Sequence, residues 1–249
     1  MTEAHTRPLG KPGENRLDRP IDLAHVVKLY ATYADDLARV REEQRRLLTV
    51  DEPRMRARLD DIEAEITYLL VRDVRPALVA EIGTFYGWST TWLLRALRDN
   101  GTGRLHSYDI VDHVRRTVPA ELSAGRWTFH QGDVRASGQL RPDTVDFLFI
   151  DAAHTASFAR WYTRQVLPRV RTGVPVSVHD VHQRLQVGPF SEGRVVLGWL
   201  GSRGIAPFTA APRAAREAYE TIVDVKRSLG LAEPVHAGGR NPMIFFRAQ

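Results

Sequence analysis

Residues 78–97 constrain the fold of this chain more than any other stretch, because they read as a buried strand, a tight turn and an amphipathic helix in succession. The first five residues are mostly apolar, whereas Gly83 and Gly87 let the backbone of a turn come close to a ligand. Ser89 and Thr90 can serve the free amides of the new helix, and apolar residues follow at helical spacing. A unit of this kind offers a ligand amide donors and the positive end of a helix.

The spacing of the glycines favours one class of ligand over another. A dinucleotide-binding turn has the pattern G-x-G-x-x-G, with small residues where the pyrophosphate meets the backbone. Here Glu81 precedes Gly83, Thr84 and Phe85 follow it, and the next glycine is Gly87. A pyrophosphate would fit poorly against Phe85 and would be repelled by Glu81, whereas a cationic ligand suits that carboxylate. An ordinary turn with two glycines is the alternative interpretation.

The rest of the chain after residue 78 alternates between apolar runs and helical patterns. Four further segments are expected to be strands, at 104–110, 127–131, 145–150 and 174–178. Alternating strands and helices predict right-handed βαβ units, and therefore an α/β fold with a Rossmann-like, doubly wound, mostly parallel sheet. A last strand is expected at 243–247, with either 234–237 or 205–209 as its partner.

The first 75 residues precede this alternation and have a different character. Residues 1–20 are polar and contain several prolines and glycines, so we expect a disordered arm. Apolar residues at helical spacing over 21–48 and 55–71 predict two helices. We therefore expect residues 21–75 to form a helical cap on a ligand-binding domain of residues 76–249. From the sequence, this cap could simply pack on the core.

Composition narrows the class of protein. The 249 residues suffice for one sizeable domain, and the absence of cysteine excludes disulfides, thiolate metal sites and a cysteine nucleophile. No apolar run reaches membrane-spanning length and the N-terminus lacks a signal-peptide pattern, so we expect a cytoplasmic protein without membrane contact. The net charge of +5 comes from arginines scattered near acids, which predicts a solvated surface and no nucleic-acid partner.

Several polar residues are expected to meet at one edge of the sheet, because ligands of such sheets bind at the carboxyl ends of the strands. Asp109 ends the second strand about 20 residues beyond Gly87, where a carboxylate accepts both hydroxyls of a ribose. A helix N-cap is the alternative for Asp109. Asp151 follows the fourth strand, and His179 and Asp180 follow the fifth. Oxygen and nitrogen ligands without sulfur suit Mg²⁺, Ca²⁺ or Mn²⁺; the alternative is that these side chains cap helices or contact another ligand.

The E-x-G-x-x-x-G-x-S pattern of residues 81–89 resembles motif I of the class I S-adenosylmethionine (SAM) methyltransferases. Its form is closest to the catechol O-methyltransferase-like branch, which includes small natural-product O-methyltransferases. The resemblance covers about residues 76–182 and the final strand. It implies SAM as the cofactor, with Asp109 at the ribose, Gly132 and Asp133 near the adenine amino group, and Asp151 beside it. The turn would supply the remaining cofactor-binding residues: Glu81, Gly83, Thr84, Phe85, Gly87 and Ser89.

The same resemblance assigns a metal and a base. In the family, an acid after strand four and an acid–amide pair after strand five hold a divalent ion. Asp151, His179 and Asp180 stand at these positions, so the resemblance implies Mg²⁺ or Mn²⁺, although the histidine departs from the family's pattern. His154 stands where the family has the lysine that takes the acceptor's proton, and a neutral imidazole can do the same. His182 is the alternative base. The resemblance also implies that the cap of residues 21–75 covers the substrate or builds a homo-oligomer.

Taken together, these observations predict a SAM-dependent methyltransferase that methylates a hydroxyl oxygen of a small molecule, such as a natural product or a sugar, with help from a metal ion. Two other functions are open. A protein of this fold can bind SAM and carry out non-methylating chemistry, as a pericyclase does. The cluster of aspartates and histidines could also serve a metal-dependent hydrolase, although Glu81 and Gly87 argue against it.

Overall fold

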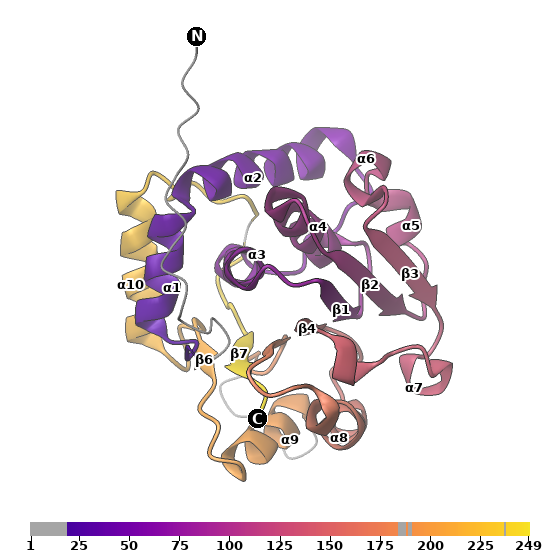
Figure 1. The fold of residues 1–249 in the computed structure, drawn as a ribbon. Helices are drawn as coiled ribbons and strands as arrows, with labels where there is room; N and C mark the ends of the chain where they lie inside the picture. Colours follow the sequence, from indigo (N-terminus) through magenta and orange to yellow (C-terminus); the bar gives the residue numbers. More distant parts are fainter. Residues whose placement is uncertain (1–18, 184–187, 189–190, 237) are drawn as a thin grey trace.

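The computed structural model describes residues 19–183, 188, 191–236 and 238–249, and within them a single seven-stranded sheet organises the chain (Figure 1). The predicted disordered arm lies almost entirely outside the described residues. The strands are β1 (Leu78–Ile82), β2 (Arg104–Asp109), β3 (Trp127–Gln131), β4 (Phe147–Ile150), β5 (Pro175–Val178), β6 (Phe208–Thr209) and β7 (Ile244–Arg247).

The strand order is β3-β2-β1-β4-β5-β7-β6, which confirms the predicted doubly wound topology. Strands β1 to β5 run parallel, whereas β7 is antiparallel to β5 and β6 is antiparallel to β7. Ile82 at the end of β1 pairs with Tyr108 on one side and with Ile150 on the other, and Ile150 pairs with Val178. This register places the residues that follow β1, β2, β4 and β5 at one edge of the sheet. The chain reverses direction across the sheet between β1 and β4, where such folds bind ligands.

Helices cover both faces of the sheet. The main ones are α1 (Leu23–Thr32), α2 (Ala34–Arg46), α3 (Asp61–Val74), α4 (Trp88–Asn100), α8 (Ala156–Gln165), α9 (Glu192–Gly201) and α10 (Arg216–Ser228). Shorter ones are α5 (Val114–Thr117), α6 (Ala120–Ser123), α7 (Val134–Ser137), the π-helix Leu47–Asp51 and the 3-10 turns Pro142–Thr144 and Leu167–Arg169. Helices α3 and α4 pack together on one face, and α8 and α9 pack together on the other (Figure 1).

The N-terminal helices differ from the prediction in their boundaries. The helix expected over 21–48 is interrupted at Tyr33, which ends α1 and precedes α2. The second helix begins at Asp61 instead of 55, because Asp60 and Glu63 form a capping box that fixes its start. The residues before it form a loop that still buries Met55 and Leu59. Apolar spacing therefore identified buried positions in this loop, but it misplaced the helix start.

The predicted cap is joined to the rest of the molecule through a common core. Apolar side chains of α1 and α3 belong to the same buried cluster as those of α4 and β7. Helix α1 also lies beside α10 (Figure 1). The carboxylate of Glu65, on α3, is buried and accepts hydrogen bonds from Tyr30 of α1 (2.7 Å) and Lys226 of α10 (2.9 Å). Arg41 of α2 completes the ion-pair cluster. The division into a cap and a ligand-binding domain stays a prediction.

The last strand pairs with the second of its two predicted partners. Strand β7 pairs with β6, within the segment 205–209, and inserts between β6 and β5. The insertion covers the edge of β5, so the strand that carries His179 is paired on both sides. His179 is thereby fixed at the end of an interior strand.

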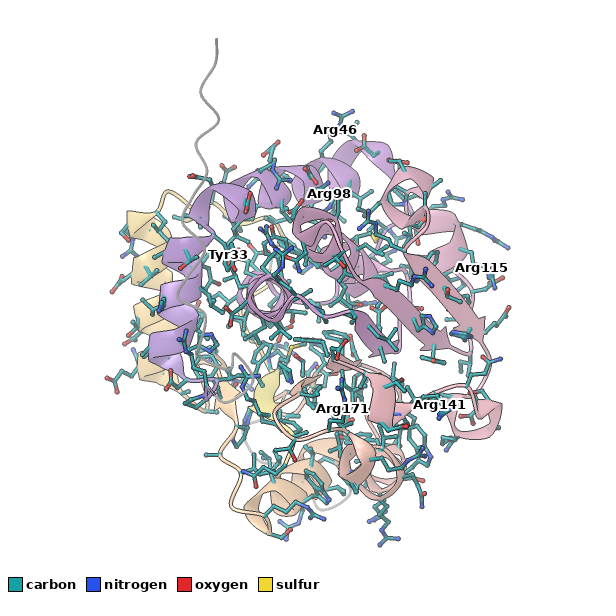
Figure 2. All side chains as sticks on the ribbon, viewed as in Figure 1. Tyr33, Arg46, Arg98, Arg115, Arg141 and Arg171 are labelled. Carbon is teal, nitrogen blue, oxygen red and sulfur yellow. The ribbon has the colours of Figure 1, made fainter. Side chains whose placement is uncertain are left out.

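Arginines that account for the basic charge are distributed around the molecule, as Figure 2 shows for five labelled examples. Arg46, Arg98, Arg141 and Arg171 each pair with a nearby carboxylate, and Arg115 lies over the ring of Phe129 at 4.9 Å. Such local pairing is what the sequence predicted for these charges. Among the described residues, no helix is long and apolar enough to cross a membrane.

Candidate functional site

A cavity of about 700 Å³ opens at the carboxyl ends of the parallel strands. Most of the residues predicted to bind a ligand line it: Gly83, Thr84, Phe85, Ser89, Asp109, Gly132, Asp133, Asp151, His154, His179 and Asp180. Three predicted residues do not: Glu81, Gly87 and His182. The cavity lies between 300 and 1,000 Å³, the range typical of small-molecule sites.

Gly83 lets the first turn lie directly against the end of β4. Its φ of +90° is one that side-chain-bearing residues rarely adopt. A Cβ atom there would lie 1.7 Å from the carbonyl oxygen of Asp151. Gly87 has a different role, because a Cβ on it would meet Val114 and Val118 at 3.0 and 2.8 Å. It packs against α5 and is the N-cap of α4, and its predicted ligand contact stays a prediction.

Asp109 holds the first turn in place. One of its carboxylate oxygens accepts hydrogen bonds from the backbone N–H groups of Thr84 (2.7 Å) and Phe85 (2.9 Å), and from the Thr84 hydroxyl (3.1 Å). The other oxygen accepts only the Val111 N–H, at 3.1 Å, among the described contacts. A carboxylate oxygen has two acceptor sites, so this second oxygen keeps capacity for a hydroxyl in the cavity.

Glu81 does not line the cavity, and its predicted contact with the cofactor stays a prediction. Its side chain is fully buried and accepts hydrogen bonds from the hydroxyls of Ser89 (2.6 Å), Thr90 (2.8 Å) and Ser107 (2.6 Å). Burial raises the pKa of Glu81 to about 7, although the three hydroxyl donors act in the opposite direction. The two hydroxyls expected to cap α4 instead bind this carboxylate, so Glu81 ties β1, β2 and α4 together.

Asp133 follows β3 at the rim of the cavity. Its carboxylate caps α7 by accepting from the Arg135 N–H (2.9 Å), and it pairs with the Arg135 guanidinium at 2.6 Å. Gly132, with a φ of +128°, donates its N–H to the Asp109 carbonyl at 2.8 Å. The turn therefore places Asp133 beside the Asp109 end of the cavity, and its contact with an adenine stays a prediction.

Carboxylates and imidazoles converge at the other end of the cavity. Asp151, His154 and His179 each present a ligand atom, and these atoms all lie within 4.8 Å of one another. His179 Nδ1 is 3.1 Å from Asp151 Oδ1, and His154 Nε2 is 3.4 Å from the same oxygen. Asp180 lies 3.3 Å from His179 Nδ1 and 3.4 Å from His154 Nε2. The convergence predicted for Asp151, His179 and Asp180 is present, and His154 joins it.

Two buried glutamates behind the histidines were not predicted. Glu63 Oε1 lies 3.0 Å from His179 Nε2, and Glu192 Oε2 lies 3.2 Å from His154 Nδ1. Glu63 comes from α3 and Glu192 from α9, far from Asp151 in the sequence. The only signal for Glu63 is the D-x-x-E capping box at the start of α3, and its usual meaning is local. Sequence patterns gave no signal for Glu192.

The charges of this cluster perturb its titration. Burial disfavours the charged ring of His179, but the carboxylates of Asp151 and Glu63 outweigh it and raise the pKa of His179 well above its usual value. Burial alone would lower the pKa of His154, but the hydrogen bond to Glu192 and the charges of Asp151 and Asp180 raise it. In the reverse direction, His179 lowers the pKa of Asp151 despite burial. The carboxylates around the two rings therefore shift both histidine pKa values in the direction that favours the protonated ring.

His182 is not at the site in this structure. It is half-buried beyond Asp180 and does not line the cavity. Its backbone N–H donates to the Pro242 carbonyl at 2.9 Å. Burial lowers the pKa of its side chain. Its position gives no support to the alternative in which His182 is the base.

The loop before α3 adds two arginines to the mouth of the cavity. Arg58 lies over the ring of Phe85 at 5.5 Å, and Arg56 lies over the ring of Tyr86 at 5.9 Å. Both arginines are exposed and line the cavity. Phe85 is 42% exposed, which is unusual for a large apolar side chain. The predicted cap therefore supplies part of the rim, and the sequence did not indicate these contacts.

Comparison with known proteins agrees with this architecture. Residues 80–181 match a family model described as a methyltransferase domain. No curated protein matches the chain significantly. Among solved structures, cofactor-bound Rv0187 from MTB has a TM-score of 0.54 at 16% identity, covering 85% of this chain and 89% of that one.

Two further solved structures are similar. A protein described as a caffeoyl-CoA O-methyltransferase from Staphylococcus aureus has a TM-score of 0.51 at 14% identity, covering 75% of this chain and 92% of that one. The O-methyltransferase TomG from Streptomyces achromogenes, involved in tomaymycin synthesis and solved with SAM, has a TM-score of 0.48 at 20% identity, covering 81% and 85%. At these identities, the structures scoring above 0.5 show a shared fold.

Proposed function

We propose that this chain, which carries a class I methyltransferase domain over residues 80–181, uses SAM to methylate a hydroxyl oxygen of a small molecule, assisted by a divalent cation. The observation that carries the proposal is the pairing, in one cavity, of a glycine turn and Asp109 at one end with the carboxylate–imidazole cluster at the other. One end suits a nucleoside, and the other suits a cation and an oxygen nucleophile.

The donor end is formed by the chain's own backbone and by Asp109. The Gly83 turn gives close access to the backbone, and the second carboxylate oxygen of Asp109 is available to a ribose hydroxyl. The methyl group would pass in line from the donor's sulfonium to the acceptor oxygen. Holding two reactants in line is itself a large part of catalysis, worth about 7–11 kcal/mol in well-oriented cases.

The acceptor end has donors that fit a divalent cation. Asp151, His179 and Asp180 would hold it. His179 Nδ1 lies 3.1 Å from Asp151 Oδ1 and 3.3 Å from Asp180 Oδ1. Ligands at about 2.1 Å from a metal and at right angles to one another are about 3.0 Å apart, so these separations suit a common ion. A cation there would lower the pKa of the acceptor hydroxyl and fix its orientation.

Of the two histidines predicted as bases, only His154 lines the cavity among the described residues. Its ring is surrounded by Glu192, Asp151 and Asp180, which raise its pKa. A raised pKa favours the protonated ring, and this works against His154 as the group that accepts the acceptor's proton.

The proposal is tested by product formation. Purified protein is incubated with SAM, Mg²⁺ or Mn²⁺ and a panel of phenols, catechols, hydroxycinnamoyl thioesters and sugars, and S-adenosylhomocysteine and methylated product are measured by mass spectrometry. The description of one fold neighbour as a caffeoyl-CoA O-methyltransferase puts hydroxycinnamoyl esters first in the panel, as an analogy of fold only.

Controls separate the proposal from its two alternatives. Asp143 is an exposed acid that does not line the cavity, so Asp143→Ala serves as the matched control for Asp109→Ala. SAM binding in calorimetry without S-adenosylhomocysteine from any acceptor would favour a non-methylating SAM protein. Metal-dependent ester or amide hydrolysis without SAM binding would favour a hydrolase. Either result would overturn the proposed function.

A further inference from the structure

We infer that the cation site has four donors, with His154 Nε2 and His179 Nδ1 joining Asp151 and Asp180, and that it binds a first-row transition ion in preference to Mg²⁺. The inference rests on the proposed function only in giving the bound ion a part in methyl transfer. It assigns His154 to the metal, in place of the base predicted from the sequence. It also gives Glu63 and Glu192 a role as positioning residues.

The separations between donor atoms are those of neighbouring ligands around one ion. Asp151 Oδ1 lies 3.1 Å from His179 Nδ1 and 3.4 Å from His154 Nε2. Asp180 approaches the same two nitrogens with different oxygens, Oδ1 at 3.3 Å from His179 Nδ1 and Oδ2 at 3.4 Å from His154 Nε2. Each histidine nitrogen therefore has a carboxylate oxygen on two sides, at distances slightly above the roughly 3.0 Å expected around a small ion. A small inward movement of the side chains would complete the coordination.

The backbone at two of the ligands supports a built site. His154 has a φ of +46° and Asp180 a φ of +57°, and both are side-chain-bearing residues in a region that favours glycine. Such conformations are unfavourable and persist where the surroundings enforce them. Both follow the ends of neighbouring parallel strands, β4 and β5. In each case the unusual turn carries its side chain to the same point.

The buried glutamates determine which nitrogen of each ring is free for a metal. Glu63 lies 3.0 Å from Nε2 of His179, so a proton held there leaves Nδ1 facing Asp151 and Asp180. Glu192 lies 3.2 Å from Nδ1 of His154, so a proton held there leaves Nε2 facing the same two acids. A carboxylate that accepts the second N–H of a ligating histidine is a regular feature of metal sites, where it orients the ring and raises its basicity.

The balance of charge also calls for a cation. Four carboxylates surround two imidazoles in this cluster: Glu63, Asp151, Asp180 and Glu192. Glu63 and Glu192 are nearly inaccessible to solvent, at 1% and 3% exposed, so water compensates little of this charge. Gln183 donates to Asp180 at 2.8 Å and contributes no charge. A divalent ion between the rings and the two aspartates would offset the excess.

The donor types decide the metal. Imidazole nitrogen suits zinc, iron, copper and nickel, whereas Mg²⁺ prefers oxygen ligands and retains several waters. A site with two imidazoles and two carboxylates therefore departs from magnesium chemistry at half of its donors. We expect Zn²⁺ and Co²⁺ to bind at least about 100-fold more tightly than Mg²⁺, because they accept imidazole nitrogen readily whereas Mg²⁺ prefers oxygen ligands.

The test measures metal binding directly. Full-length protein without a histidine tag is stripped with a chelator, and Zn²⁺, Mn²⁺, Co²⁺ and Mg²⁺ are titrated by calorimetry and by competition with a chromophoric chelator. His154→Ala should weaken Zn²⁺ binding by at least about tenfold, and Co²⁺ absorption should change with the loss of a nitrogen ligand. His182→Ala is the matched control, because His182 does not line the cavity.

The positioning residues are tested by conservative variants. Glu63→Gln and Glu192→Gln should each weaken metal binding by about 10- to 100-fold. Glutamine also serves in a capping box, so Glu63→Gln should keep α3 folded. SAM affinity of the metal-free variants checks that the cavity is intact.

Equal affinity for Mg²⁺ and Zn²⁺, or unchanged Zn²⁺ affinity in His154→Ala, would overturn the inference. Failure of the wild type to bind SAM would instead count against the proposed function and would leave the metal result standing.

Discussion

Replacing Glu81 by glutamine should change how the stability of the protein depends on pH. Glu81 is fully buried and holds Ser89, Thr90 and Ser107 together at the end of β1. Burial raises its pKa from an ordinary 4.5 to about 7, with the three hydroxyls partly opposing the shift. Glutamine has nearly the same shape and stays neutral, so Glu81→Gln isolates the cost of the buried charge.

The direction of the effect follows from where the proton is held. Below about pH 4.5 the carboxyl is protonated in both the folded and the unfolded chain, and wild type and variant differ by a constant amount. Between pH 4.5 and 7 the unfolded chain ionises first, so the wild type loses stability as pH rises. A rise from 4.5 to about 7 corresponds to about 3 kcal/mol, lost by pH 8.

Urea unfolding, followed by tryptophan fluorescence, measures this loss. Free energies of unfolding of wild type and Glu81→Gln are compared at pH 5.0, 6.0, 7.0 and 8.5 at constant ionic strength. The difference between them should shift in favour of the variant by about 2.5 kcal/mol from pH 5.0 to 8.5, because part of the loss has already occurred at pH 5.0. The comparison with the variant cancels the titration of other groups, provided their environments are unchanged.

Glu43 is a control with the opposite shift. Burial acts to raise its pKa, but hydrogen bonding from Arg98 and the charge of Arg95 lower it. Its stabilising contribution is therefore lost only as pH falls below its ordinary range. Glu43→Gln should give a curve parallel to wild type from pH 5.0 to 8.5. A Glu81→Gln curve equally parallel to wild type would refute the reasoning, because it would mean that Glu81 is ionised at pH 5.

Three further changes test other parts of the structure. Asp109→Ala should weaken SAM binding by about ten- to hundredfold in calorimetry, because a charge-assisted hydrogen bond contributes about 1.5–3 kcal/mol; unchanged affinity in a folded variant would remove its ligand role. Gly83→Ala should lower both SAM affinity and stability to urea, because its Cβ would lie 1.7 Å from the Asp151 carbonyl oxygen and its φ is +90°; retention of both would contradict the tight turn. Lys226→Met should lower the free energy of unfolding by about 3 kcal/mol, because it leaves buried Glu65 short of a charged partner; a loss below about 1 kcal/mol would show that the rest of the cluster compensates.

The parallel sheet was predictable because its signals are local. Strands β1, β3, β4 and β5 are short runs dominated by apolar or β-favouring residues, whereas β2 is mostly polar apart from Leu105 and Tyr108. Helical spacing separates most of the strands, so order and direction follow from short-range patterns. Boundaries were less predictable, since Asp60 and Glu63 decide where α3 begins and Tyr33 interrupts the first helix. The partner of β7 depended on a pairing distant in sequence, which local patterns do not encode.

The ligand edge was predictable for a related reason, since parallel strands end together. Asp109, Asp151, His179 and Asp180 were identified by their place after a strand, and all four line the cavity. Glu81 also has a recognisable place, but the direction of its side chain depends on Ser107, which lies on the neighbouring strand. The position of Glu81 in the motif therefore predicted that it lies near the cavity, but it did not predict which groups its side chain contacts.

Sequence patterns did not identify Glu63 and Glu192 as partners of the two histidines. These glutamates nevertheless explain physically how His154 and His179 can stand at positions where the family's pattern has other residues. An imidazole in place of a carboxylate or lysine brings a ring whose tautomer must be fixed, and each ring here has its own buried carboxylate within 3.2 Å. Glu63 also accepts from the Asp60 N–H at 2.9 Å and from the Met243 N–H at 3.1 Å. One side chain thus links the start of α3, the residue before β7 and His179. A change that loosens α3 should therefore reach His179, and with it the proposed cation site, through Glu63.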